Sequence, residues 1–164
     1  ESSAAMINEY PNLLVIQTLS KSRSLAGLRV GFALGHEELI EGLGRIKDSM
    51  NSYTLDRLAL LGAAEAINDE GYFKETTKKI IATRERTSGE LNKFGFTIIP
   101  SRANFIFIRH PQYQASVLFQ RLRDRGVLVR YFNLPRIDNY LRVTIGSDEE
   151  MRRFLGAVKE IITL

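Results

Sequence analysis

The chain has 164 residues, of which 44% are hydrophobic and 26% are charged, so a disordered chain is excluded. Its net charge of +4 is modest and its acidic and basic residues interleave, so we expect no nucleic-acid partner. The absence of cysteine and the presence of only two histidines argue against disulfides, thiolate chemistry and a metal site. With no long apolar run and no signal segment, a cytoplasmic protein without a membrane partner is expected.

Apolar runs alternate with polar, glycine-containing segments in the first part of the sequence. Residues 13–17 predict a buried strand, and residues 18–27 are small and polar, which is typical of a loop. A second strand is expected over 29–34, followed by a helix over 36–47. Residues 55–67 predict a further helix, which is apolar on most sides and is therefore expected to be buried.

The second part of the sequence predicts a small α/β arrangement after a long, charged helix over 71–92, an element typical of a bridge between two lobes. Further strands are expected at 96–99, 103–108, 127–130 and 140–145, and further helices at 117–125 and 148–163. Ser147 is a suitable N-cap for the last helix, with Glu150 completing a capping box. The alternation indicates an α/β fold with a boundary within residues 70–95.

The segment from Thr18 to Gly31 places one lysine, Lys21, among hydroxyl groups between two apolar strands. A partly desolvated lysine amine can form an imine with an aldehyde. Arg29, Thr18 and Ser20 supply donors suited to a phosphate, and an aldehyde that carries a phosphate is pyridoxal phosphate. A solvated surface loop rich in Ser, Lys and Arg has the same composition, so the residues alone leave that alternative open.

Ser20-Lys21, seven further residues and then Arg29-Val-Gly resemble the cofactor-lysine motif of class I/II aminotransferases of fold type I. The fuller string Thr-Leu-Ser-Lys…Leu-Ala-Gly-Leu-Arg-Val-Gly is most similar to the histidinol-phosphate aminotransferases. The resemblance implies that Lys21 is catalytic, binding pyridoxal phosphate as a Schiff base and then shuttling a proton. It also implies that Arg29, Thr18 and Ser20 bind the cofactor phosphate. Arg23 departs from the pattern, which usually has an aromatic or small residue there.

A second motif, residues 140–146 (Tyr-Leu-Arg-Val-Thr-Ile-Gly), resembles the strand that carries the family's substrate-binding arginine. The resemblance implies that Arg142 binds the substrate carboxylate, and a planar guanidinium suits that task because it binds carboxylates in bidentate fashion. An edge-strand arginine in a surface ion pair is the alternative.

Other residues match the family more weakly or carry no assigned role. Asn104, in Ser-Arg-Ala-Asn-Phe, is as compatible with closing a turn as with touching a ligand. The roles of Asn51, Tyr53 and Arg130 are left open. Both histidines, His36 and His110, are expected at the surface.

The resemblance covers the whole chain but matches only the C-terminal half of such an enzyme. It implies that residues 1–70 are the C-terminal part of a large pyridoxal-phosphate-binding domain, 71–95 a connecting helix and 96–164 a small C-terminal α/β domain. The expected function is transfer of an amino group between histidinol phosphate and 2-oxoglutarate, in histidine biosynthesis, by a homodimer. This chain alone is expected to be inactive. A related aminotransferase, a phosphothreonine decarboxylase relative and a non-catalytic binding or assembly module are the alternatives.

Overall fold

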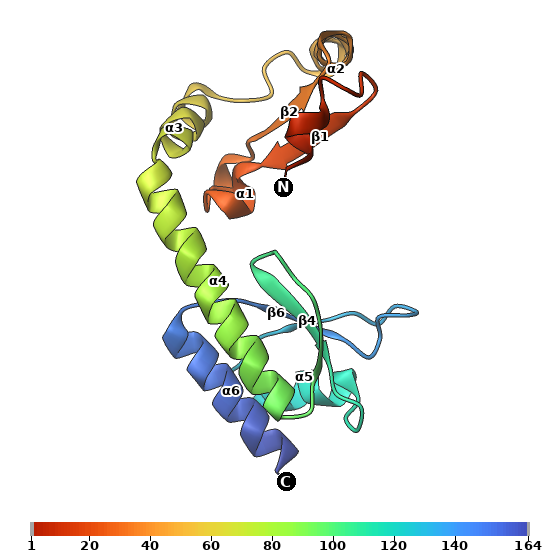
Figure 1. Cartoon of the computed structure of the whole chain (residues 1–164), viewed down its shortest axis with the longest axis vertical. Coiled ribbons are helices and arrows are strands. Elements are labelled where there is room, and N and C mark those ends of the chain that lie inside the picture. The colour runs from red at the N-terminus through yellow and green to blue at the C-terminus, as the bar shows by residue number, and fades with distance from the viewer. Residues whose placement is uncertain (1, 164) are drawn as a thin grey trace. The chain divides into compact units, whose positions relative to one another are not determined.

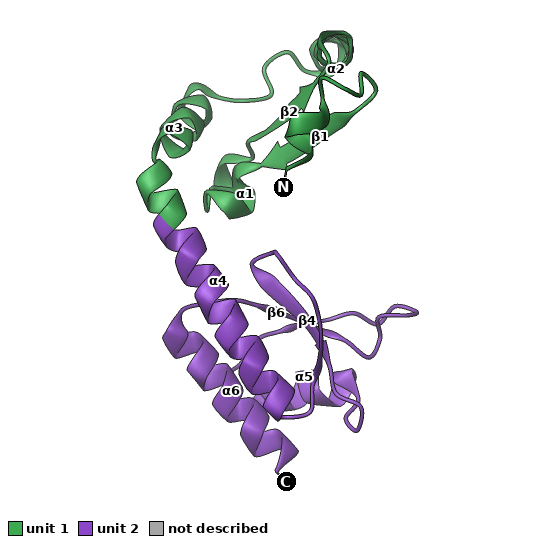
Figure 2. Ribbon diagram, viewed as in Figure 1, with its two compact units in different colours: residues 1–74 green, residues 75–164 purple. Residues whose placement is uncertain are grey.

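The computed structural model describes residues 2–163, which fall into two compact units, residues 1–74 and 75–164 (Figure 2). Both units contain helices and strands, so the fold is mixed α/β (Figure 1). The regular alternation expected from the sequence is not found, because α2, α3 and α4 follow one another, as do β3 and β4. The division falls within the longest helix, α4 (Glu70–Lys93). In the described part of the chain, no helix combines the length and the apolar character needed to cross a membrane.

Unit 1 contains an antiparallel pair of strands, β1 (Leu14–Thr18) and β2 (Gly31–Gly35), after a short 3-10 helix, η1 (Ser3–Met6). Their register places Thr18 opposite Gly31 at one end of the pair. The second strand begins two residues later than predicted because Arg29 has a left-handed backbone with φ of 55°, a conformation that does not continue a strand.

The segment between these strands was predicted as a loop, and that prediction is wrong for two short turns, α1 (Leu19–Ser22) and η2 (Ala26–Leu28). The first turn forms because Thr18 is its N-cap: the Thr18 side chain accepts a hydrogen bond from the Ser20 backbone N–H. Leu19, which is 3% exposed, anchors the turn in the core of the unit.

Two helices follow, α2 (Glu37–Met50) and α3 (Arg57–Asn68), close to their predicted positions. The expectation that the second is buried is wrong, because Leu58 and Leu61 are 77% and 63% exposed. The helix is apolar on several sides, but within this unit only its alanine side packs against other residues. The core of unit 1 comprises Leu19, Val30, Ala59 and Ala63.

Unit 2 contains a four-stranded antiparallel sheet in the order β3-β4-β6-β5, with helices α5 and α6 after α4. The strands are β3 (Thr97–Ile99), β4 (Phe105–Arg109), β5 (Arg130–Tyr131) and β6 (Leu141–Thr144), and the helices are α5 (Ala115–Asp124) and α6 (Asp148–Ile162).

The predicted strand over 127–130 is wrong except for its last residue. The N–H of Val127 instead bonds to the carbonyl of Leu122 and closes the end of α5, with Gly126 in the left-handed region at φ of 70°.

One face of this sheet forms the core of unit 2 together with the three helices. The buried side chains include Ile106, Ile108, Leu141 and Val143 from the strands and Leu91, Leu118, Leu122, Phe154, Val158 and Ile161 from the helices. Because strand side chains alternate between faces, Phe107 and Arg142 lie on the opposite face. The fold therefore directs Arg142 away from the core while its neighbours in sequence hold the strand in place.

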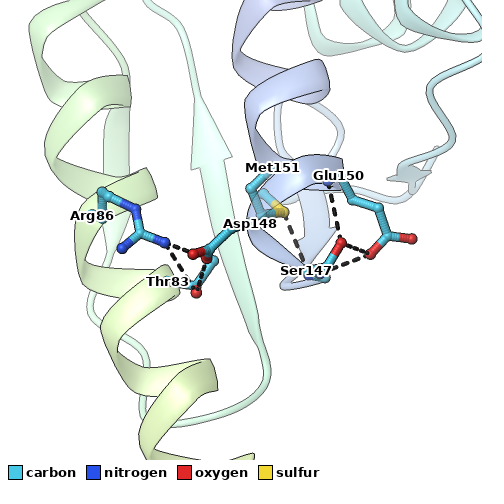
Figure 3. A network of polar contacts seen from close by, with 7 residues as sticks. Thr83, Arg86, Ser147, Asp148, Glu150 and Met151 are labelled. Atoms are coloured by element: carbon cyan, nitrogen blue, oxygen red, sulfur yellow. Dashed lines mark hydrogen bonds and ion pairs between the residues drawn. The ribbon is translucent and has the colours of Figure 1, made fainter.

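The N-terminus of α6 confirms the predicted capping box. The Ser147 side chain accepts from the Glu150 N–H, and the Glu150 carboxylate accepts from the Ser147 N–H at 2.7 Å. The next residue, Asp148, joins α6 to α4, because its carboxylate accepts a 2.6 Å hydrogen bond from Thr83 and pairs with Arg86 (Figure 3). The pKa of Asp148 is lowered, chiefly by the Thr83 hydrogen bond and then by nearby arginine charges.

Because of the contacts of Asp148, we expect the thermal stability of the protein to depend on pH. A carboxyl whose pKa is lowered by folding contributes stability in full above its unfolded pKa, which is about 4, and loses it as the pH falls through the folded value. Asp148→Asn should therefore lower the Tm at about pH 7, and the difference from the wild type should shrink below about pH 4. Thermal scans across this range check it, with Asp138→Asn as a matched surface control. A difference that stays constant with pH would contradict it.

His110 is buried, 5% exposed, and the expectation of a surface position is wrong. Its Nε2 lies 3.1 Å from the Phe94 carbonyl, and its Nδ1 accepts a 3.1 Å hydrogen bond from the Gln112 N–H. The carbonyl needs a donor, so the geometry assigns the proton of the ring to Nε2. The ring thereby closes the end of α4, and a Cβ at Gly95 would approach Nε2 to 3.2 Å. His36, by contrast, is exposed, as predicted.

His110→Ala should lower the free energy of unfolding by about 2–4 kcal/mol, because it leaves a cavity and two backbone groups without partners. His36→Ala is the matched control, since His36 makes no side-chain cap bond, and should change stability by less than about 0.5 kcal/mol. Urea unfolding of both variants measures the difference. Equal effects of the two substitutions would refute the structural role of His110.

Candidate active site

Lys21 lies in a single helical turn whose backbone is held at both ends. At its start, Thr18 Oγ1 accepts from the Ser20 N–H at 3.1 Å and lies 2.8 Å from Ser20 Oγ. Ser22 Oγ donates to the Thr18 carbonyl at 3.1 Å, so three hydroxyl-bearing residues organise the turn. The Lys21 side chain is exposed. The turn therefore carries an exposed lysine and two adjacent hydroxyl groups, and Lys21 is not desolvated within this chain.

The strands approach closely beside this turn. A Cβ at Gly31 would lie 2.8 Å from the Gln17 carbonyl oxygen, so only glycine fits opposite the end of β1. Thr18, the partner of Gly31 in the register, is thereby kept at the start of the turn. Gly31→Ala would push β1 and β2 apart and displace the Thr18 hydroxyl.

Backbone strain is concentrated after Lys21. Among the described residues, three non-glycine residues have positive φ, and two of these, Ser24 at 58° and Arg29 at 55°, belong to this segment. A left-handed conformation costs a non-glycine residue roughly 1–2 kcal/mol. Strain of this kind gathers at sites where a side chain must be held in a particular place, which supports a functional reading of the segment.

Arg29 follows η2, which packs against the Lys21 turn. Its side chain is exposed, and Nη1 donates a 2.8 Å hydrogen bond to the Ala26 carbonyl within the same segment. The structure thus places Arg29 on the neighbouring turn, with its guanidinium resting on the backbone.

The donors of this segment fit pyridoxal phosphate in their chemistry. The aldehyde requires an accessible primary amine, which Lys21 supplies, and the phosphate requires hydroxyl and guanidinium donors. Thr18 and Ser20 already share a 2.8 Å hydrogen bond, so both hydroxyls lie within reach of one anion. Lys21 would hold the aldehyde carbon, while Thr18, Ser20 and Arg29 would hold the phosphate.

Arg142 is placed on the outer face of the unit 2 sheet by the alternation of β6. Its register partners are Phe107 on β4 and Arg130 on β5. The guanidinium carbon lies 5.4 Å from the ring of Phe105 and 5.8 Å from that of Phe132. Within residues 2–163, the Arg142 Nε is the one buried side-chain polar atom left without a hydrogen-bond partner.

The role left open for Arg130 becomes clearer in the structure, because it lies directly opposite Arg142. Like charges opposite each other on antiparallel strands destabilise a sheet, and no ion pair to either arginine occurs in the described chain. Two adjacent guanidiniums without a carboxylate partner suit an anionic ligand. Sequence reasoning missed the pair because the register of two short strands cannot be read from their spacing.

The remaining candidates have local roles. Asn51 ends α2 and its side-chain oxygen accepts from the Tyr53 N–H at 3.0 Å, while Tyr53 itself is 92% exposed. The Asn104 carbonyl accepts from the Ile145 N–H, which continues the pairing of β4 with β6. Lys21 belongs to unit 1 and Arg142 to unit 2.

The model of the aminotransferase class I and II family matches residues 1–158, and the chain belongs to this family. Among its relatives is the histidinol-phosphate aminotransferase of Clostridium botulinum (strain Langeland), 66% identical over 162 residues. That match covers 99% of this chain and 46% of the relative, so the chain spans about half the length of the curated relatives it matches.

Two solved structures have the same fold over about half their length. The histidinol-phosphate aminotransferase of Sinorhizobium meliloti, in complex with pyridoxal-5'-phosphate, has a TM-score of 0.81 at 28% identity, over 93% of this chain and 42% of its own. The histidinol-phosphate aminotransferase of Clostridium acetobutylicum has a TM-score of 0.89 at 24% identity, and the match covers 99% of this chain and 49% of that one. The mixed α/β fold of this chain is therefore the aminotransferase fold over about half of those structures.

Proposed function

We propose that the full-length protein is a pyridoxal-phosphate-dependent aminotransferase that moves an amino group between histidinol phosphate and 2-oxoglutarate. The observation that carries the proposal is the Lys21 turn, in which an accessible amine stands beside paired hydroxyls in the family's cofactor-lysine motif. The 66% identity to a histidinol-phosphate aminotransferase supports the choice of amino donor.

The candidate site residues of this chain have separate roles in the proposed reaction. Pyridoxal phosphate, when bound, supplies an electron sink for the bonds at the substrate Cα. Lys21 Nζ would hold the cofactor and, when free of it, would take the proton from the substrate Cα as a general base. Thr18, Ser20 and Arg29 keep the phosphate in place. Arg142 would bind an anionic group of the substrate.

The division of the chain into two units supports a finer assignment of domains. Residues 1–70 would be the C-terminal part of the large cofactor-binding domain, 71–95 the connecting helix and 96–164 the small α/β domain. The full-length protein would be a cytoplasmic homodimer, and this chain alone would be inactive because it spans 46% of its relative.

Amino-donor specificity tests the proposed substrate. The full-length protein is supplied with 2-oxoglutarate and either histidinol phosphate, phenylalanine or phosphothreonine, and glutamate formation is followed. We expect the highest kcat/KM with histidinol phosphate. Preference for phenylalanine would indicate a related aminotransferase, and carbon dioxide release from phosphothreonine a decarboxylase. Absence of every reaction in a folded, cofactor-loaded protein would favour a non-catalytic module.

A further inference from the structure

Arg23 directly follows the Lys21 turn, and its side-chain contacts reach far along the chain. Its backbone N–H bonds to the carbonyls of Leu19 and Lys21 and closes the helical turn. Its side chain donates from Nη1 to the carbonyl of Asp69, 46 residues away, at 3.2 Å. Its guanidinium carbon also lies 4.0 Å from the centre of the Phe73 ring. Arg23 therefore contacts both the Lys21 turn and a distant part of unit 1.

That distant part is the joint between two helices. Asp69 ends α3, where its N–H bonds to the Glu65 carbonyl, and it begins α4, where its side chain accepts from the Tyr72 N–H at 3.1 Å. The carbonyls at a helix C-terminus carry partial negative charge, which favours a cation there. Phe73 lies in the first turns of α4 and offers the face of its ring to the same cation. The joint thus binds the Arg23 guanidinium from two sides.

The Lys21 turn needs such an anchor. A helix of four residues has too few internal hydrogen bonds to be stable alone. Leu19 secures its start through burial, whereas Lys21 and Ser22 are exposed, so the contacts of Arg23 add to the few backbone hydrogen bonds that hold the end of the turn. The Arg23 charge also faces the start of α4: the pKa of Glu70 is lowered, first by the hydrogen bond and the charge of Lys74 and to a smaller extent by the charge of Arg23.

We infer that Arg23 is a positioning residue, which ties the Lys21 turn to the joint of α3 and α4 and so fixes the place of the Lys21 amine. The inference rests on the proposed function, because it concerns the lysine that would hold the cofactor. Arg23 touches neither cofactor nor substrate in this role. Its effect on the reaction passes through the orientation of Lys21.

Three variants of the cofactor-loaded, full-length protein test this role. Arg23→Met removes the charge and keeps the length, Arg23→Lys keeps a cation for the Phe73 ring, and Arg45→Met is the control. Arg45 is an exposed arginine of the same unit whose partner, Glu41, lies on its own helix. The readouts are the rate of cofactor release, the visible circular dichroism per bound cofactor, and kcat and KM separately.

We expect Arg23→Met to release the cofactor about tenfold faster, to weaken the circular dichroism band and to lower kcat with little change in KM for the amino donor. Arg23→Lys should recover most of the release rate and of the band, and Arg45→Met should match the wild type. If Arg23→Met does not fold, Phe73→Leu removes the aromatic ring that contacts the Arg23 guanidinium. This variant should change the readouts in the same direction.

Wild-type release rate and circular dichroism in Arg23→Met, or in Phe73→Leu, would overturn the inference, and so would failure of lysine to recover them. These outcomes leave the proposed function intact, because the wild-type protein still holds its cofactor through Lys21. A wild-type protein that takes no cofactor on Lys21 would overturn the proposed function and this inference together.

Discussion

Lys21→Ala is expected to lower the kcat/KM of transamination by at least about a thousandfold in the full-length protein, because one substitution removes both the covalent anchor of the cofactor and the base. The Lys21 side chain is exposed and the turn is held by other residues. In the cofactor-free protein, the free energy of unfolding should therefore change by less than about 0.5 kcal/mol, whereas the cofactor-loaded protein also loses the stabilisation that the bound cofactor provides. Steady-state kinetics and urea unfolding measure the two effects.

Lys47→Ala is the matched control, since Lys47 is an exposed lysine of the same unit paired with Asp48 on its own helix. It should keep wild-type kinetics and wild-type stability. Activity retained in the Lys21 variant would show that another group performs the proton transfer, and the proposed role of Lys21 would then be wrong. A large loss of stability would instead show that Lys21 supports the fold.

Arg142→Ala should lower kcat/KM for the amino donor by roughly a hundredfold to a thousandfold, because a charge-assisted, bidentate contact to an anionic substrate group is lost. Arg142→Lys keeps the charge and loses the planar fork, so a loss of about tenfold is expected. Arg121→Ala, on the exposed side of α5, is the control and should leave kcat/KM unchanged. Steady-state kinetics with several donor concentrations separates the effects on KM and kcat.

Replacement of Arg142 should not lower the stability of the protein, although it lowers the activity. Arg142 lies opposite Arg130, and its buried Nε lacks a hydrogen-bond partner among the described residues. Both features cost stability, about 1 kcal/mol or more for the unpaired donor. Arg142→Met retains contact with the aromatic rings, so it should leave the free energy of unfolding unchanged or raise it by up to about 1 kcal/mol. A marked destabilisation would show that Arg142 serves the fold rather than a ligand.

The sequence predicts the parts of this molecule that depend on local chemistry. The capping box of Ser147 and Glu150 is found where expected because its hydrogen bonds join residues three apart. The two strands on either side of Lys21 also lie close to their predicted positions, whereas the two short helical turns between them were predicted as a loop. The cross-strand pairing of Arg130 with Arg142 depends on register, and the contact of Arg23 with Asp69 spans 46 residues. Such contacts depend on how the elements pack together, which the hydrophobic periodicity of the sequence does not predict.

Burial was the least predictable property. Leu58 and Leu61 are exposed because an apolar helix is buried only where other elements cover it, and in unit 1 only the side with Ala59 and Ala63 is covered. His110 is buried because its two ring nitrogens find partners in the Phe94 carbonyl and the Gln112 N–H. Composition gives no sign of either outcome, since both depend on which other residues pack against these side chains.

Reduction of the full-length, pyridoxal-phosphate-loaded protein with borohydride, followed by peptide mass spectrometry, identifies the lysine that binds the cofactor. We expect the label on the peptide containing Lys21 and its loss in Lys21→Ala. A label on a different lysine, or none on a folded protein at saturating cofactor, would contradict the assignment of Lys21 as the cofactor-binding residue.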